Sequence, residues 1–444
     1  MATKVKKATR LSPFRLATLL RQEKDPNAAL SLFLSPPQPF PYSYQCYDLL
    51  LTKLAYSRLF PPLEQILDRL RADERVTPKE PLFCHIISSY ARGRLPSRAH
   101  DLFLLIPSFR CSRTVKSFNS LLDAYLRCGN LEAFESLWHN AGSYGVYPDA
   151  CSYNIYMRAV CLSGSVSRAW ELFDEMPTRG ISPTVVTFGT LIAILCDNLM
   201  LREALSLKER MLTLYNVKPN VVIYITLIKA LCKSGELSKA FKLKEEILLH
   251  KDLELNSFIY TTLIRALFSS GQKGEVTVLL EEMKANRITP DNATFNSMIA
   301  GFCEDEKNFN AAFEVLNEMQ RNGCKPDLIS YNTIINGFCK VARWRDAQDL
   351  FEDMPRRGCK PDIVTYRILF DAICNCKEFK EVVVLLDEMV SKGYTPSLYG
   401  TKKFLEGIMG RYDGLFVESF MCQFMKLNRL EVNSWEKVVS RLRV

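Results

Sequence analysis

The sequence predicts an all-α fold, a superhelical α-solenoid of about ten antiparallel helix–turn–helix repeats. Three residue types indicate it, because aromatic residues, prolines and methionines each recur along the 444-residue chain at an interval of 35 or 36. The aromatic series is Tyr47, Phe83, Phe118, Tyr153, Phe188, Tyr224, Tyr260, Phe295, Tyr331 and Tyr366. A fixed period of this length, shared by independent residue types, is typical of stacked repeats.

Each repeat has the pattern of two helices joined by a short turn. In residues 328–362, Tyr331, Ile334 and Phe338 fall on one face of a first helix, and a second apolar stripe follows. Gly358 and Pro361 then end the second helix. One such helix pair cannot bury both apolar faces alone, whereas stacked neighbours can. The stack therefore has an extended concave wall.

The period also sets the boundaries along the chain. Residues 23–43 are a degenerate N-terminal helical start, and residues 398–444 are a partial repeat with capping helices. The repeats between them form one solenoid over residues 44–397, because no linker separates them. They are 44–79, 80–114, 115–149, 150–184, 185–220, 221–256, 257–291, 292–327, 328–362 and 363–397.

Charge and composition exclude several classes of protein. The net charge of +9 lies at the two ends of the chain, and residues 23–397 are formally neutral. Binding to a nucleic acid would thus depend on particular positions rather than on bulk charge. The longest apolar runs are far shorter than the roughly 18 residues of a membrane span. Fifteen cysteines without a secretory leader favour a reducing compartment.

Residues 1–22 have the composition of an organelle-targeting presequence. They carry six basic residues and no acidic one, and leucines recur among them at helical spacing. Serine is scarce in this segment, which favours a mitochondrion over a plastid. The alternative interpretation is a solvated basic start to the first helix.

The repeat consensus resembles the pentatricopeptide repeat family, in its pure 35-residue class from plant organelles. The resemblance is carried by residues 185–191 (VVTFGTL), 328–334 (LISYNTI), 231–235 (LCKSG) and 357–362 (RGCKPD). Tetratricopeptide repeats have a period of 34 and other marker residues. Membership implies a protein that binds single-stranded RNA and recognises one base per repeat.

The resemblance implies that the fifth and last residues of each repeat face the base edge. An Asn amide offers a donor and an acceptor, and the last residue orients it. In the family, Asn with Asp favours U, Thr with Asp favours G, and Asn with Thr favours a pyrimidine (Y). The pairs are Asn119/Asp149, Asn154/Thr184, Gly189/Asn220, Ile225/Asn256, Thr261/Asp291, Asn296/Asp327, Asn332/Asp362 and Arg367/Ser397. The implied target is U-Y-n-n-G-U-U-n.

Some repeats assign no base. Ile225 cannot hydrogen-bond a base edge, and Arg367 departs from the usual choices. Repeats 44–79 and 80–114 carry pairs without an assigned base, and Gly189 with Asn220 assigns none either. These gaps concern specificity rather than RNA binding.

Two further positions follow from the same resemblance. The second residues of adjacent repeats would hold a base between them, and five of them are well suited: Val186, Val222, Phe258, Ile329 and Val364. A position that often carries a phosphate-binding lysine is basic at Arg127, Lys233 and Lys340. Only three of eight repeats have a cation there, which predicts a moderate salt dependence of RNA binding.

Two functions remain open at this point. The first is a sequence-specific RNA-binding protein of organellar RNA metabolism, in stabilisation, processing, splicing or translation. Its partners would be single-stranded RNA and other organellar RNA-processing proteins, and we expect a monomer. The second is a protein-binding solenoid, a scaffold or assembly factor without a specific RNA target. We expect no enzyme activity, cofactor or metal, because the sequence has no Walker loop and no metal-ligand motif.

Overall fold

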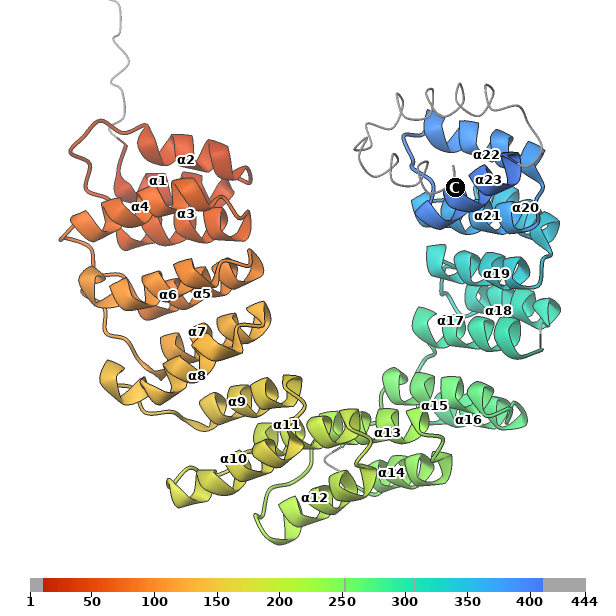
Figure 1. Cartoon of the computed structure of the whole chain (residues 1–444), viewed down its shortest axis with the longest axis horizontal. Coiled ribbons are helices and arrows are strands. Elements are labelled where there is room, and N and C mark those ends of the chain that lie inside the picture. Colours follow the sequence, from red (N-terminus) through yellow and green to blue (C-terminus); the bar gives the residue numbers. More distant parts are fainter. Residues whose placement is uncertain (1–10, 251–252, 307, 410–444) are drawn as a thin grey trace, which may run out of the picture. The chain divides into compact units, whose positions relative to one another are not determined.

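The computed structural model describes residues 11–250, 253–306 and 308–409. All secondary structure in these ranges is helical, which confirms the predicted all-α class (Figure 1). Contacts divide the chain into an N-terminal half up to Ile223 and a C-terminal half from Tyr224. The capping helices expected over residues 398–444 fall within the described ranges only up to residue 409.

The N-terminal half begins with a helical hairpin and continues as helix pairs. Its helices are α1 (Pro13–Gln22), α2 (Pro26–Leu34), α3 (Tyr44–Tyr56), α4 (Phe60–Ala72), α5 (Glu80–Arg92), α6 (Pro96–Leu105), η1 (Ile106–Phe109), α7 (Val115–Cys128), α8 (Leu131–His139), η2 (Ala141–Tyr144), α9 (Ala150–Leu162), α10 (Val166–Thr178), α11 (Val185–Asp197) and α12 (Leu201–Thr213). Helix α13 (Val221–Lys233) starts in this half and continues into the next.

The C-terminal half repeats the same plan. It contains α14 (Leu237–Leu249), α15 (Ser257–Ser269), α16 (Gly274–Ala285), α17 (Asn292–Gly301), the π-helical turn η3 (Phe302–Glu306), α18 (Phe309–Arg321), α19 (Leu328–Lys340), α20 (Trp344–Asp353), α21 (Ile363–Asn375), α22 (Phe379–Ser391) and α23 (Leu398–Met409). Each predicted repeat from 44–79 to 363–397 therefore holds a first and a second helix.

First helices of successive repeats pack on one another within each half. In the N-terminal half α5 contacts α7, α7 contacts α9, and α9 contacts α11. In the C-terminal half the corresponding series is α15, α17, α19, α21 and α23. Second helices lie against the first helix of the same repeat, as α10 does on α9 and α20 on α19. This packing buries both faces that a single helix pair leaves open.

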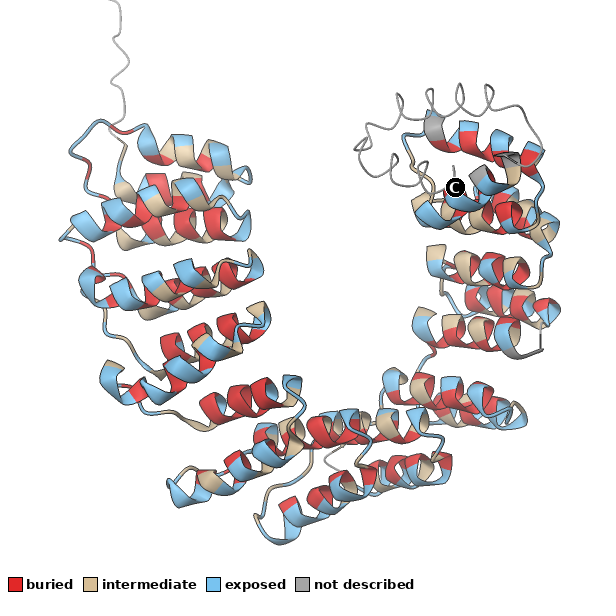
Figure 2. Cartoon of the chain, viewed as in Figure 1, coloured by how far each residue is buried: buried red, intermediate tan, exposed pale blue. Residues whose placement is uncertain are grey.

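The periodic aromatic residues form the core, as predicted. They are buried in every repeat, and four of them (Tyr153, Tyr260, Tyr331 and Tyr366) are among the largest fully buried side chains. Figure 2 shows this as a buried stripe on each helix beside exposed residues. The tyrosine hydroxyls still find partners, because Tyr153 donates to Glu175 at 3.2 Å and Tyr260 donates to Glu282 at 3.1 Å. A glutamate 22 residues onward thus satisfies the polar end of the ring.

The last residue of most repeats starts the next first helix. Asp149, Asp291, Asp327 and Asp362 are N-caps whose carboxylates accept from the backbone N–H three residues onward. The hydroxyl oxygen of that third residue accepts a hydrogen bond from the backbone N–H of the cap residue, which completes a capping box. At the other end of the repeat, Gly358 has φ +77°, a left-handed conformation that suits glycine after a helix.

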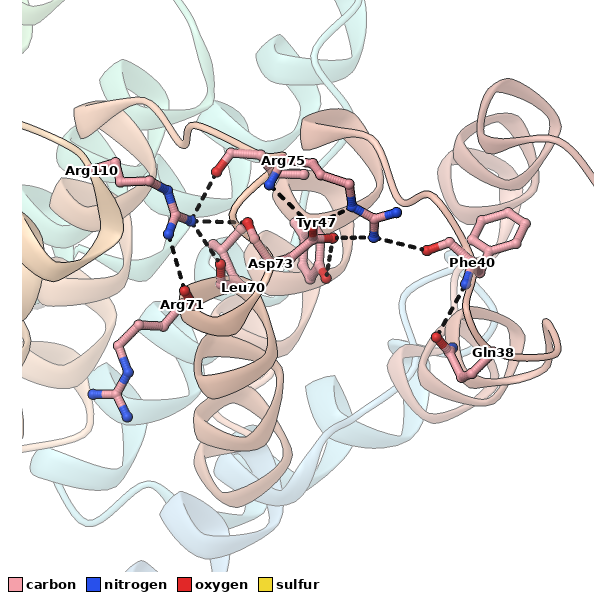
Figure 3. Close-up of polar contacts among 9 residues, drawn as sticks. Gln38, Phe40, Tyr47, Leu70, Arg71, Asp73, Arg75 and Arg110 are labelled. Atoms are coloured by element: carbon pink, nitrogen blue, oxygen red, sulfur yellow. Dashed lines mark hydrogen bonds and ion pairs between the residues drawn. The ribbon is translucent and has the colours of Figure 1, made fainter.

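Arginines tie the N-terminal repeats together. Arg110 donates to the carbonyls of Leu70, Arg71, Asp73 and Val76 at 3.0–3.3 Å, at the C-terminal end of α4 (Figure 3). Leu70 and Arg71 lie in the last turn of α4, where carbonyls lack a partner inside the helix, so the guanidinium supplies one. Arg75 pairs with Asp73 in the same figure and reaches the Phe40 carbonyl.

Helix α1 belongs to the folded part of the N-terminal half. Its Leu16 and Leu20 side chains are fully buried, and the helix packs on α3. Residues 1–10 of the proposed presequence lie outside the described ranges. In the described part of the chain, no helix combines the length and the apolar character needed to cross a membrane.

Candidate nucleic-acid interface

Two of the predicted base-facing pairs are joined by hydrogen bonds. Asn119 Nδ2 donates to Asp149 Oδ1 at 3.1 Å, and Asn296 Nδ2 donates to Asp327 Oδ1 at 3.3 Å. Asn332 and Asp362 lie near one another, and the Asn332 amide contributes to the lowered pKa of the Asp362 carboxyl. Each bond links the first helix of one repeat to the start of the next. An ionised carboxylate can only accept hydrogen bonds, so the amide turns its NH2 group towards the carboxylate and its oxygen away from it.

The carboxylates at these pairs stay ionised. Burial alone raises the pKa of Asp327, but hydrogen bonds from the Ser330 backbone, the Ser330 hydroxyl and Asn296 outweigh it and lower the pKa below its usual value. Asp149, Asp291 and Asp362 have a lowered pKa through the same balance of burial against hydrogen bonds. Each therefore serves both as a helix cap and as a charged acceptor at neutral pH.

Two further pairs are arranged differently. Thr261 donates to the Ser257 carbonyl at 2.8 Å. Its hydroxyl also lies 2.8 Å from that of Thr294, which donates to Asp291 Oδ1 at 2.9 Å, so this pair is linked through Thr294. At the pair Asn154/Thr184, the Thr184 hydroxyl lies 3.2 Å from the Thr187 hydroxyl. Asn154 Oδ1 is buried there without a hydrogen-bond partner.

Among the residues that the structure describes, no hydrogen bond joins the two members of a pair that assigns no base. Asn220 and Asn256 cap the next first helix through the backbone N–H groups of Ile223 and Ile259, each at 3.1 Å. Arg367 turns to Thr395, donating to its carbonyl at 2.8 Å and to its hydroxyl at 2.9 Å. Ser397 instead donates to Asp371. Arg367 and Ser397 are thus each engaged with another residue.

The predicted base-holding residues project from the surface. Val186, Val222, Phe258, Ile329 and Val364 are each between 49% and 64% exposed, although they lie in first helices that are otherwise well buried. Exposed large apolar side chains at one fixed position of the repeat offer a row of surfaces on which flat bases can stack.

The predicted phosphate-binding cations are largely engaged with acidic residues. Arg127 Nε lies 2.5 Å from Asp123 Oδ2, and Lys340 Nζ lies 3.2 Å from Glu304 Oε1. All four side chains are partly exposed, so these pairs are screened by solvent. Lys233 is exposed.

Three further cations were not predicted from the sequence. Arg158, Lys229 and Arg265 occupy the ninth position of their repeats, one helical turn before the predicted phosphate position, and they are exposed. Arg265 borders a cavity of about 670 Å³ that Asn296 and Ile329 also line. A basic residue four places earlier on the same helix face was the signal that could have found them.

Serine or threonine at the third position was also missed. Ser152, Thr187, Thr294, Ser330 and Thr365 are buried and in phase. Ser152 and Ser330 donate to the Oδ1 atoms of Asn119 and Asn296, each at 2.6 Å. Across residues 11–250, 253–306 and 308–409, no group of three or more His, Cys, Asp or Glu side chains is arranged to hold a metal ion.

Family models match most of the repeats. The PPR repeat family model matches residues 113–162, 148–197, 255–304, 294–340 and 326–375. Two PPR repeat models match residues 215–248, and residues 186–214 and 364–394. Together these matches span more than half of the chain. The chain belongs to the pentatricopeptide repeat family.

Relatives agree with this membership, and a solved structure shares the fold. A pentatricopeptide repeat-containing protein of Arabidopsis thaliana is 46% identical over 178 residues, which is 38% of this chain and 38% of the relative. A mitochondrial one from the same plant is 28% identical over 38% of this chain and 32% of its own length. The chain thus matches about a third of the length of these relatives. Yeast Rmd9p, solved in complex with a 16-nucleotide target RNA, has 13% identity and a TM-score of 0.51 over 97% of this chain and 94% of its own.

Proposed function

We propose that this pentatricopeptide repeat protein binds single-stranded RNA sequence-specifically, with the core U-Y-n-n-G-U-U, and acts in organellar RNA metabolism without chemistry of its own. One observation carries the proposal. The Asn119 and Asn296 amides donate to the last-position carboxylates of Asp149 and Asp327, and five second residues from Val186 to Val364 are apolar and exposed. An oriented amide between two stacking surfaces is suited to the edge and faces of one unstacked base.

A direct binding assay tests this function. The purified full chain is titrated into a fluorescent RNA containing the U-Y-n-n-G-U-U core, and into an RNA of the same composition in shuffled order, at stated salt. The expected result is at least tenfold tighter binding to the core, because each matched base adds a stacking and hydrogen-bonding contribution on the order of 1 kcal/mol or more. Equal affinities would contradict sequence-specific binding.

The site of action that we propose is a mitochondrion, with a plastid as the alternative. The basic, acid-free N-terminus supports an organelle address, and a mitochondrial relative is among the matches. The burial of Leu16 and Leu20 on α3 favours cleavage ahead of Pro13, since removal of residues 1–22 would uncover the first repeat. N-terminal sequencing of the imported protein tests this: a mature end beyond Gln22 would contradict it.

A protein-binding scaffold is the second candidate function. It is favoured by the ion pairs that already occupy Arg127 and Lys340, and by Ile225, which offers no hydrogen bond to a base. On this alternative, the chain would bind no RNA specifically, and a protein partner would co-purify with it at fixed stoichiometry.

A further inference from the structure

Two repeats with the same predicted base preference hold their asparagine differently. Asn296 with Asp327, and Asn332 with Asp362, are both Asn/Asp pairs in the C-terminal half. At the first, the Ser330 hydroxyl donates to Asn296 Oδ1 at 2.6 Å, so both ends of the amide have a partner. At the second, Asn332 Oδ1 is a buried atom without a hydrogen-bond partner.

The difference lies in the third residue of the following repeat. A hydroxyl has one hydrogen to donate. Ser330 gives its shortest contact to Asn296, and its contact with Asp327 Oδ1 is longer, at 3.0 Å. Thr365 donates to Asp362 Oδ1 at 2.9 Å and accepts from the Asp362 backbone N–H at 3.2 Å. The hydroxyl thus serves the amide where it is serine and the cap where it is threonine.

The N-terminal half shows the same division independently. Ser152 donates to Asn119 Oδ1 at 2.6 Å, while Asn119 Nδ2 donates to Asp149. Asn154 is followed by Thr187, and its Oδ1 is buried without a hydrogen-bond partner. Where the third residue of the following repeat is serine, the asparagine Oδ1 accepts a hydrogen bond from it. Where that residue is threonine, the asparagine Oδ1 has no hydrogen-bond partner.

A held amide distinguishes the two pyrimidines. Cytosine presents an amino donor where uracil presents a carbonyl acceptor, and the ring nitrogen beside it is an acceptor in cytosine and a donor in uracil. An amide can match either base if it turns over, because turning exchanges its donor and acceptor. Hydrogen bonds at both Nδ2 and Oδ1 oppose this turn, whereas an amide whose Oδ1 has no hydrogen-bond partner is less opposed to it.

We infer that the third residue of the following repeat is a positioning residue that sets how strongly a fifth-position asparagine prefers uracil to cytosine. Serine strengthens the preference at Asn119 and Asn296, and threonine leaves it weaker at Asn154 and Asn332. This inference rests on the proposed function. It adds a residue that touches no base but acts through the amide that does.

A reciprocal exchange tests the inference in the full chain. The RNA carries the proposed core, with U or C at the base assigned to Asn296 or at the base assigned to Asn332. The measured quantity is the ratio of dissociation constants for C and U at each position. One neutral hydrogen bond corresponds to a ratio about threefold to tenfold larger at Asn296 than at Asn332 in the unchanged protein. Ser330→Thr should lower the first ratio, and Thr365→Ser should raise the second.

The exchange separates positioning from folding. Both residue types complete capping boxes in this chain, so neither variant removes a helix cap. Ser117→Thr is the matched control: it changes a buried serine at the same position, but the preceding repeat has Cys84 in place of an asparagine. We expect it to leave both ratios unchanged.

Each outcome separates the inference from the function it rests on. Tight binding to the core with equal ratios at the two positions, or ratios that do not follow the exchange, would overturn the inference and leave RNA recognition standing. Binding that does not distinguish the core from a shuffled RNA would overturn both.

Discussion

Tyr331 and Asn332 are adjacent in α19, yet they belong to two different regions of the molecule. Tyr331 lies in the buried stripe, where the fourth residue of each repeat is aromatic. Asn332 lies on the neighbouring face, where the fifth residues are Asn, Asp, Cys, Thr, Gly, Ile or Arg. The side chains of successive helical residues point about 100° apart around the helix axis. The uniform stripe thus carries the fold, and the variable face beside it can differ from repeat to repeat without cost to the core.

The largest effect separating the two regions is expected from Tyr331→Ala. Tyr331 is 1% exposed, and truncation of a buried aromatic side chain costs about 3–5 kcal/mol of unfolding free energy. Urea unfolding followed by circular dichroism measures this cost. The protein that remains folded should keep its order of preference among RNAs. A loss below about 1 kcal/mol would show that the stripe does not carry the fold as described.

Asp327→Ala affects both regions, and the expected effect on stability is smaller. The substitution removes the cap of α19, which costs about 0.5–2 kcal/mol, and it removes the acceptor that orients Asn296. Unfolding and RNA titration should therefore both respond, the second only at the base assigned to Asn296. Asp327→Asn retains a capping side chain and is the control for stability. A loss of affinity spread equally over all RNA positions would contradict the assignment.

Asn332→Thr is expected to change recognition alone. Thr with Asp is the pair that favours G, so the preference at one base should move from U towards G, with about tenfold or smaller effects, since a single hydrogen-bonding contact is exchanged. Titration with four RNAs that differ at this base measures the shift. A uniform loss of affinity for all four would show that Asn332 does not face that base.

The smallest effect concerns pH. Hydrogen bonds outweigh burial and lower the pKa of Asp327, so its contribution to stability is present above the unfolded value of about 3.9 and is lost as the pH falls through the lower folded value. The difference in thermal midpoint between the unchanged protein and Asp327→Asn should be constant from about pH 7 to 5, and should shrink below about pH 4. A difference that already shrinks near pH 6 would contradict a lowered pKa.

The buried stripe was predictable from the sequence because its chemistry repeats. An aromatic residue every 35 or 36 positions determines the helix pair, its inward face and its stacking partner, and the structure confirms these. Gly358 was expected to end a helix, and its left-handed conformation does so. The pairing of Asn119 with Asp149 was also anticipated, through the resemblance to a family.

The rest of the interface depends on contacts between repeats, which spacing alone does not show. Ser330 looks like a capping residue in the sequence, and its second role appears only in the distance to Asn296. Glu304 and Lys340 are 36 residues apart, and their ion pair removes a cation that composition counts as available. Local patterns specify which side chains share a face of the first helices, but the partners of those side chains come from the neighbouring repeat.

An unbiased selection of RNA by the purified full chain, at stated and near-physiological salt, is the decisive measurement for base recognition. We expect enrichment of a U-Y-n-n-G-U-U core, with the strongest preference for U at the bases assigned to Asn119 and Asn296. Binding without enrichment of any sequence, or no binding, would contradict recognition by these residues and would favour a protein partner instead.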